Sequence, residues 1–133
     1  MTDIPEHLRY TPEHEYLREA DEEGEVFIGI TDYAQGELGD VVYVELPAPG
    51  EEFGRMEAFG TVEAVKTVSE LFCPAAGEVV AVNEALEADP ALVNSDPYGE
   101  GWMIRLALES PDDIEDLLTA DQYAALVADA DEH

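Results

Sequence analysis

Lys66 has the clearest chemical potential in this sequence, because it is the only lysine among 133 residues. It lies in the stretch GTVEAVKTVSE, residues 60–70, among small, β-branched and acidic residues. The sequence shows no partner that would lower the pKa of this amine for Schiff-base chemistry. A lysine exposed on a turn instead suits an amine that another enzyme must reach and modify.

The other reactive side chains give weaker signals. Cys73 is the single cysteine, so no internal disulfide can form, and a lone cysteine is more often a small core residue than a nucleophile. His14 and Glu15 are an acid–base pair by type, but adjacent residues in a strand point to opposite faces. His7, His14 and His133 lack the spacing of metal ligands, and no phosphate-binding or calcium-binding loop is present. The sequence predicts no enzyme activity and no metal site.

The charge balance is strongly acidic: five basic and 33 acidic residues give a formal net charge of −28. Such a chain repels nucleic acid and anionic membranes. Its acids interleave with apolar residues, which make up 46% of the sequence and favour a folded chain with an acidic coat over disorder. Because the Debye length falls to about 3 Å at 1 M salt, this coat favours a halophilic prokaryote as the source. An ordinary acidic protein is the alternative.

The composition also limits the location and the number of domains. No apolar run approaches the roughly 18 residues of a membrane span, and the first ten residues, MTDIPEHLRY, do not have the pattern of a secretion signal. With a single cysteine, these features predict a cytoplasmic protein. The length fits one domain over residues 1–133, with a core at about 14–109 and C-terminal helices at about 111–129.

Short β-strands are expected on both sides of Lys66. The runs 58–65 and 67–73 flank it, which places the lysine at or beside the tip of a hairpin. Other expected strands cover residues 26–31, 40–46 and 77–83, and a last strand ends at residue 108 after a loop that begins at residue 92. Strands this short, joined by turns, predict a mainly β protein with a small sandwich or a flattened barrel.

A short helix is expected between the strands at 26–31 and 40–46. Asp32 and Gln35 have the spacing of a capping box, and Gly36 or Gly39 can end the helix.

Two further helix starts are expected near the C-terminus. Ser110 precedes Pro111, which suits the first helical position, and Thr119 with Gln122 repeats the capping-box spacing.

Taken together, these motifs resemble the glycine cleavage system H protein family. The matching stretches run in order from about residue 14 to residue 118: HEY, IGITDYAQGELGDVVYVELPAPG, FGTVEAVKTVSELFCPAAGEVVAVNEAL, LVNSDPYGEGWM and SPDDIEDLL. The resemblance implies a flattened barrel or sandwich of the lipoyl/biotinyl-carrier type, with short helices that include a helical C-terminus.

The resemblance also implies that Lys66 carries lipoate in amide linkage. Such a carrier does no chemistry alone. It shuttles the aminomethyl group of glycine from a pyridoxal-phosphate glycine decarboxylase to a tetrahydrofolate-dependent aminomethyltransferase. A dihydrolipoamide dehydrogenase reoxidises the arm, and a lipoate ligase or lipoyl synthesis enzymes attach the cofactor. Arginine cannot replace this lysine, because a ligase must acylate a primary amine.

Two acids are candidates to contact the cationic amine of the cargo. Glu15, in HEY, is the first, because the resemblance places that segment beside the arm. Glu37 is the second, and its contact is less certain because some relatives carry other polar groups there. Tyr16 follows HE where the family often has tryptophan.

Related classes remain as alternatives. Biotin carriers usually have methionine on both sides of the lysine, where this chain has Val65 and Thr67. Lipoyl domains of 2-oxo-acid dehydrogenases usually have Asp-Lys-Ala and lack the GITDYAQ segment. An H-like lipoyl relay protein in lipoate assembly and an unmodified acidic interaction module both stay open.

Overall fold

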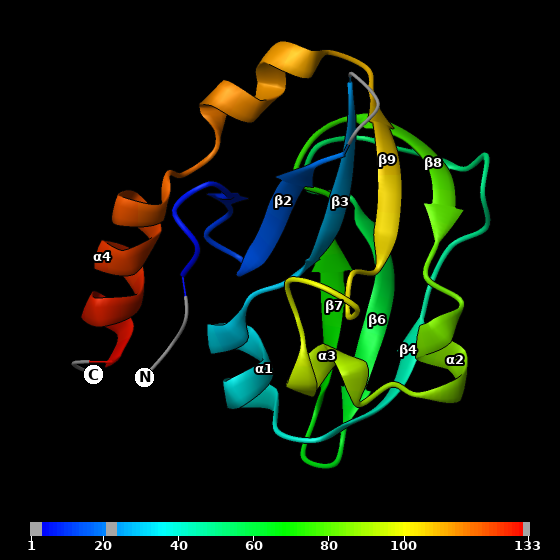
Figure 1. Ribbon diagram of the computed structural model, residues 1–133, viewed down its shortest axis with the longest axis vertical. Helices are drawn as coiled ribbons and strands as arrows, with labels where there is room; N and C mark the ends of the chain where they lie inside the picture. Colours follow the sequence, from blue (N-terminus) through cyan, green and yellow to red (C-terminus); the bar gives the residue numbers. More distant parts are fainter. Residues whose placement is uncertain (1–3, 21–23, 132–133) are drawn as a thin grey trace.

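The computed structural model describes residues 4–20 and 24–131, in which two antiparallel sheets pack face to face (Figure 1). Within these residues the larger sheet has the strand order β1 (Arg9–Tyr10), β2 (Glu15–Glu19), β3 (Glu25–Ile30), β9 (Ile104–Leu108), β8 (Gly77–Val82) and β5 (Glu52–Phe53). The smaller sheet has the order β4 (Val41–Glu45), β6 (Ala58–Ala64) and β7 (Val68–Phe72). The mainly β prediction is confirmed.

Apolar side chains from the inner faces of both sheets form the main core. Val44 in β4 lies opposite Val62 in β6, and both are buried. Ile28, Val79 and Leu106 of the larger sheet belong to the same apolar cluster and are fully buried. Each fully buried side chain of this kind contributes about 1.5–3 kcal/mol, so this core holds the two sheets together.

The structure contains three strands that the sequence pattern does not reveal. Two of them, β1 and β5, are only two residues long, which is too short for a periodic pattern. The third, β2, reads EYLRE and buries Glu15, Tyr16 and Leu17 in succession, so it lacks the alternation of a half-exposed strand. The strands expected on both sides of Lys66 are confirmed as β6 and β7.

The first helix, α1 (Asp32–Leu38), is present, but its expected N-cap was wrong by one residue. The cap is Thr31, whose hydroxyl accepts a hydrogen bond from a backbone amide of the first turn. Gln35 Nε2 instead donates to the carboxylate of Asp32 inside the helix, at 2.7 Å. Gly39 ends the helix with a φ of 83°, a conformation that glycine adopts readily.

Two four-residue helices, α2 (Ala85–Ala88) and α3 (Leu92–Ser95), follow β8. The expectation of a plain loop from residue 92 was therefore wrong. Each helix buries one apolar side chain, Leu86 or Val93, in the main core. Both helices lie at the end of the sandwich where α1 and the β6–β7 turn are found (Figure 1).

The helical C-terminus is confirmed. The first piece is a 3₁₀-helix, η1 (Pro111–Asp116), rather than an α-helix, and α4 (Ala120–Asp131) follows it. The predicted capping box at α4 is present, because Thr119 N–H donates to Gln122 Oε1 at 2.9 Å and Gln122 N–H donates to Thr119 Oγ1 at 3.3 Å.

A second, smaller core rich in tyrosine attaches α4 to the N-terminal segment. Tyr10 in β1 stacks on Tyr123 in α4, with 4.6 Å between ring centroids. Both rings are fully buried, together with Tyr16. Two backbone hydrogen bonds of 2.9 Å between Tyr10 and Leu118 join the same segments. The C-terminal helix is therefore fixed beside the first strands, although they lie at opposite ends of the sequence (Figure 1).

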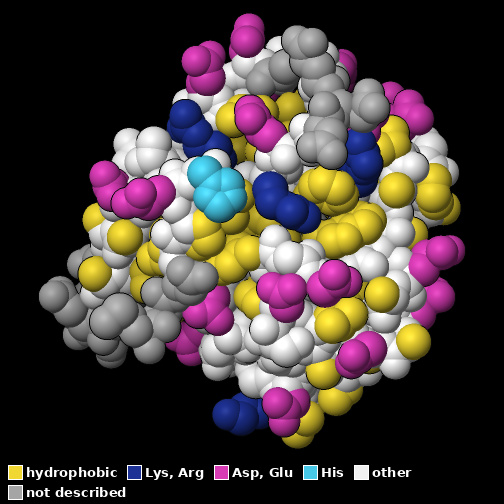
Figure 2. All heavy atoms as spheres, viewed as in Figure 1, with side chains coloured by type: hydrophobic (Ala, Val, Ile, Leu, Met, Phe, Trp, Pro, Cys, Tyr) yellow, Lys and Arg dark blue, Asp and Glu magenta, His cyan; other side chains and the backbone are white. Residues whose placement is uncertain are grey.

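Acidic side chains are spread over the face of the molecule seen in Figure 2. Arg105 pairs with Glu25 at 2.7 Å across β9 and β3, and its guanidinium also lies over the Phe27 ring. Trp102, just before β9, packs edge-on against the same ring. In the part of the chain that the structure describes, no helix combines the length and apolar character needed to cross a membrane.

Candidate functional site

Lys66 occupies the exposed turn between β6 and β7, as the sequence predicts. The last strand pair is Glu63 with Val68, and the turn closes with a 2.8 Å hydrogen bond from Ala64 N–H to Thr67 C=O. Beside the lysine, Val65 N–H donates to the carbonyl of Asp40 at 3.1 Å and joins the turn to the start of β4. Backbone hydrogen bonds thus fix the turn while the lysine side chain projects from it.

The stem of Lys66 lies over the connection between α1 and β4. Its Cε is 3.9 Å from the position that a Cβ would occupy on Gly39, the residue that ends α1. The last residues of that helix, Glu37 and Leu38, belong to the wall of a nearby pocket. The Lys66 side chain therefore lies next to the wall of the pocket that α1 forms.

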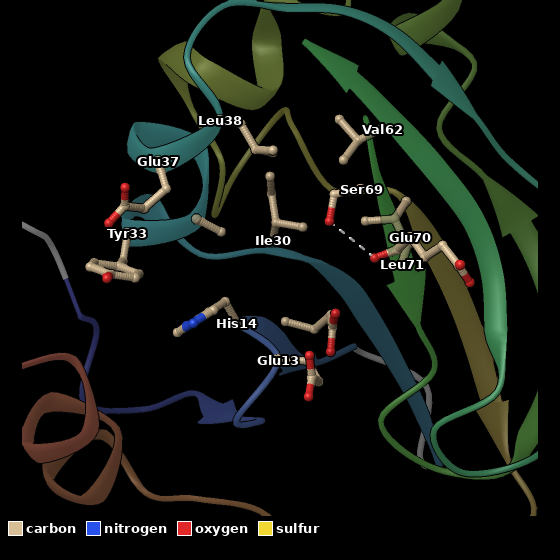
Figure 3. Close-up of a pocket in the computed structure, with 12 residues that line it drawn as sticks. Glu13, His14, Ile30, Tyr33, Glu37, Leu38, Val62, Ser69, Glu70 and Leu71 are labelled. Carbon is tan, nitrogen blue, oxygen red and sulfur yellow. Dashed lines mark hydrogen bonds between the residues drawn. The ribbon is translucent and has the colours of Figure 1, made fainter. Parts of the chain in front are cut away.

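The pocket has a volume of about 290 Å³ and opens between α1, the turn before β2, and the β6–β7 hairpin (Figure 3). Its inner wall is apolar, with Ile30, Leu38, Val62 and Leu71. Its polar lining includes His14, Tyr33, Ser69 and four acids, Glu13, Glu15, Glu37 and Glu70. An apolar wall with acids around it suits a ligand that combines an alkyl chain with a cationic end.

Glu15 belongs to the polar lining of the pocket and is only 1% exposed. Thr11 Oγ1 donates to its Oε1 at 2.7 Å, and Phe72 N–H donates to its Oε2 at 3.4 Å. Burial raises the pKa of Glu15 to about 7, although these two hydrogen bonds favour the ionised form and oppose the shift. Near neutral pH this carboxyl can therefore exist with or without its proton.

His14 adopts a left-handed backbone conformation, with a φ of 72°, in the turn that leads into β2. Its Nδ1 lies 2.8 Å from the hydroxyl of Tyr123 in α4, and that hydroxyl lies 2.7 Å from Thr31 Oγ1. Burial lowers the pKa of His14, while the carboxylates of Glu13 and Glu37 act in the opposite direction. The imidazole is thus held neutral near pH 7 at the pocket wall.

The structure corrects one sequence argument about His14 and Glu15. The two residues were expected to point to opposite faces of one strand, but β2 begins only at Glu15. Because His14 precedes the strand and has a positive φ, both residues line the same pocket. Their side chains are bonded to Tyr123 and Thr11 rather than to each other.

The pocket also brings together residues that the sequence analysis did not select. Glu37 was a candidate, whereas Glu13, Ser69 and Glu70 were not, and all four line the pocket. Ser69 and Glu70 follow the lysine closely in the hairpin, which is the one local signal that could have identified them. Glu13 reaches the site through the turn before β2.

Cys73 is a core residue, as expected. It is fully buried, its thiol donates to the carbonyl of Ala75 at 3.1 Å, and burial raises its pKa to about 11. Within residues 4–20 and 24–131, no group of three or more His, Cys, Asp or Glu side chains is arranged to hold a metal ion. His133 lies outside the described residues.

Comparisons with known proteins agree with this geometry. The family model described as glycine cleavage H-protein matches residues 8–130. The chain is 54% identical to the glycine cleavage system H protein of Salinibacter ruber over 122 residues, 92% of this chain and 97% of the relative. It is 52% identical to the H protein of Chlorobium phaeobacteroides over 124 residues, 93% and 97% of the two chains.

A solved structure shows the same architecture. A crystal structure of a glycine cleavage system H protein from Mycobacterium marinum has a TM-score of 0.85 and 41% identity, and the match covers 94% of this chain and 99% of that one. None of these comparisons supports the expected halophilic source, which still depends on the net charge alone. The cytoplasmic location likewise stays a prediction.

Proposed function

Because the chain belongs to the glycine cleavage H-protein family and is therefore the lipoyl carrier of that system, we propose that Lys66 is its lipoyl attachment residue. Members of this family carry lipoate on a lysine and work with the P, T and L proteins of the system. The observation that carries the proposal is that Lys66 is the only lysine of the sequence and occupies an exposed hairpin turn. In this proposal the chain itself performs no catalytic step.

The surroundings of Lys66 fit an attached lipoyl chain. Lys66 is exposed. The aliphatic part of its side chain lies against Gly39, which has no side chain that would obstruct an attached lipoyl group. Ser69, a pocket residue, follows Lys66 by three residues, so their Cα atoms are at most about 11 Å apart. A lysine extended by a lipoyl chain reaches beyond that distance, and the apolar pocket wall suits its hydrocarbon part.

When bound, lipoate supplies a disulfide, one sulfur of which accepts the aminomethyl group of glycine. We propose that the pocket holds the cationic amine of that cargo between enzymes. Glu13 and Glu37 line the pocket with exposed carboxyl groups, and Glu15 contributes a buried one. A fully exposed ion pair contributes only about 0–1 kcal/mol, so retention of the amine requires the partly buried site that Glu15 offers.

The attachment proposal is tested by mass spectrometry of natively expressed protein. The expected result is a gain of one lipoyl mass in the peptide that contains Lys66. A native protein found only in the unmodified form would contradict the proposal. A glycine-dependent assay with the decarboxylase then separates a glycine cleavage carrier from a lipoyl relay protein, because a relay does not accept the aminomethyl group.

The retention proposal is tested by the lifetime of the cargo. Wild type and Glu15→Gln are loaded with glycine and the decarboxylase, the enzyme is removed, and release of formaldehyde and ammonia is followed. We expect faster release from Glu15→Gln, since its amide cannot carry a negative charge. Glu78→Gln, an exposed position in β8, is the matched control. Equal lifetimes of all three proteins would leave Glu15 without this role.

A further inference from the structure

Four exposed apolar side chains surround the turn that carries Lys66. Val42 and Tyr43 in β4, Val65 in the turn and Val68 in β7 are 53%, 50%, 72% and 60% exposed. These four residues are called the tip patch. Single exposed apolar residues are ordinary, but a group of them beside one functional lysine, on a chain with a net charge of −28, is typical of an interaction site.

The strand register places Tyr43 and Val68 on the same face of the smaller sheet, in one cross-strand row with Glu63 between them. Tyr43 lies opposite Glu63 in β6, and Glu63 lies opposite Val68 in β7. Directly opposite residues project from the same side of a sheet, and all three are exposed, so this row covers the outer face. A register shift between Val41 and Tyr43 leaves Val42 exposed beside the row.

Acidic residues lie both within and around the tip patch, beginning with Glu63 between Tyr43 and Val68. The next cross-strand row of the outer face begins with Glu45 in β4 and ends with Glu70 in β7, and both are exposed. On the side of the turn, exposed Asp40 accepts the hydrogen bond of Val65, which holds that valine next to β4. A complementary partner therefore has an apolar contact area bordered by arginine and lysine.

We propose that the tip patch is the docking surface for the enzyme that attaches lipoate to Lys66. This inference rests on the proposed function, in which Lys66 is the attachment residue. The attaching enzyme contacts the outer face of the smaller sheet through the four apolar side chains, and its basic residues meet the surrounding acids.

The attaching enzyme is the partner that must contact the turn, because its reaction takes place at Lys66 Nζ. The P, T and L proteins act at the far end of the arm, a lysine and a lipoyl chain away from the hairpin. The attaching enzyme must bring its activated carbonyl carbon to Lys66 Nζ itself, so it must contact the turn directly. The pocket takes Val62 and Leu71 from the buried side of the hairpin, and Glu70 is the one residue of the two outer-face rows that also borders it, so an enzyme on the tip patch leaves most of the pocket free.

The attachment reaction requires only groups that such a complex supplies. The neutral amine of Lys66 attacks the carbonyl carbon of lipoyl adenylate, the mixed anhydride that the enzyme makes from lipoate and ATP. The amide N–C bond forms while the bond from the carbonyl carbon to the phosphate oxygen breaks. AMP leaves with that electron pair, and one amine proton passes to a base or to water. Nothing is oxidised or reduced.

The test measures initial rates of lipoylation with purified lipoate ligase, ATP, lipoate and the unmodified full chain. The double variant Tyr43→Ser/Val68→Ser removes two members of the tip patch. Val80→Ser is the matched control, because Val80 is an exposed apolar residue of β8 in the other sheet. We expect kcat/KM to fall by about tenfold or more in the double variant, mainly through KM, and to change less than about twofold in the control.

Further measurements separate the alternatives. Thermal unfolding verifies that the double variant is folded. After prolonged incubation brings the double variant to full lipoylation, its loading with glycine by the decarboxylase is expected to match wild type. Equal lipoylation rates for wild type and the double variant would overturn the proposal. Equal losses in both assays would overturn the assignment to the attaching enzyme, because the patch would then serve other partners.

Two remaining outcomes are also decisive. If wild type self-associates in size-exclusion chromatography and the double variant does not, the tip patch is a contact between copies of this chain and the proposal is wrong. If wild type itself is never lipoylated, the proposed function fails, which is distinct from failure of the docking surface alone.

Discussion

The hairpin turn around Lys66 and the pocket next to it are stabilised by different kinds of contacts. At the turn, backbone hydrogen bonds set the shape, and the side chains of Val65 and Lys66 are exposed. In the pocket, hydrogen bonds to their side chains fix Glu15 and His14, and the partners come from the turn before β2, from β7 and from α4. The turn can therefore accept a new chemical group without repacking, whereas the pocket depends on the folded core.

The largest difference is expected for Lys66→Arg. Lipoylation should be abolished, because arginine has no primary amine that an acyl adenylate can acylate. The free energy of unfolding should change by less than about 0.5 kcal/mol, since the side chain is exposed. Intact mass and urea unfolding measure the two effects. A destabilised variant would contradict the view that the turn is independent of the core.

The second prediction concerns the pH dependence of stability and the buried Glu15. Its pKa is about 7 in the folded protein and near the ordinary 4.5 when the chain unfolds. Between these values the folded state keeps a proton that the unfolded state has released, so stability falls as pH rises from about 4.5 to 7. The difference of about 2.5 pH units corresponds to about 3 kcal/mol.

Glu15→Gln cannot titrate and should lack this loss. The difference in unfolding free energy between the variant and wild type should therefore change by about 3 kcal/mol in favour of the variant as the pH rises from 4.5 to 8. Urea unfolding at a series of pH values gives this difference. Glu45→Gln, exposed on the smaller sheet, should follow the wild-type pH dependence. Parallel curves for wild type and Glu15→Gln would contradict the buried carboxyl as the cause.

A smaller effect is expected for Tyr123→Phe. The change removes the hydroxyl that contacts His14 Nδ1 and Thr31 Oγ1, while the ring can still stack on Tyr10. Loss of buried hydrogen bonds of this kind costs about 1–3 kcal/mol. Urea unfolding measures the loss, and NMR of the imidazole reports whether its environment changes.

Tyr43→Phe is the control for that experiment, because the Tyr43 ring is half exposed in β4 and the change removes a hydroxyl from the surface. Its unfolding free energy should change by less than about 0.5 kcal/mol. A loss for Tyr123→Phe no larger than that for Tyr43→Phe would mean that the hydroxyl contacts of Tyr123 contribute no measurable stability.

The turn was predictable from sequence, and the pocket was not, for a physical reason. The two strand-like runs and the lysine between them are contiguous, so local β propensity is enough to define the hairpin. The pocket combines the turn before β2, helix α1 and the hairpin, and no local pattern reports how three separate segments meet. Glu15 and Glu37 were selected through a family resemblance, and their contact with the arm stays a prediction.

The structural details that the sequence missed are short or depend on one hydrogen bond. Helices α2 and α3 have four residues each, too few for a helical period to show. The N-cap of α1 is Thr31 and not the predicted Asp32. Both side chains can accept a hydrogen bond from a backbone amide, and sequence spacing does not decide between neighbouring residues. The cap of α4 was predictable because Thr119 and Gln122 satisfy each other reciprocally.

The burial of Cys73 has a consequence for a protein whose family carries a disulfide on a flexible arm. A thiol opens a disulfide by thiol–disulfide exchange, in which the thiolate attacks one sulfur and forms a mixed disulfide. With a pKa of about 11, only about one Cys73 in ten thousand is a thiolate at pH 7, and the group has no access to solvent. The carrier therefore cannot capture its own cofactor, and the arm stays available to the enzymes that it serves.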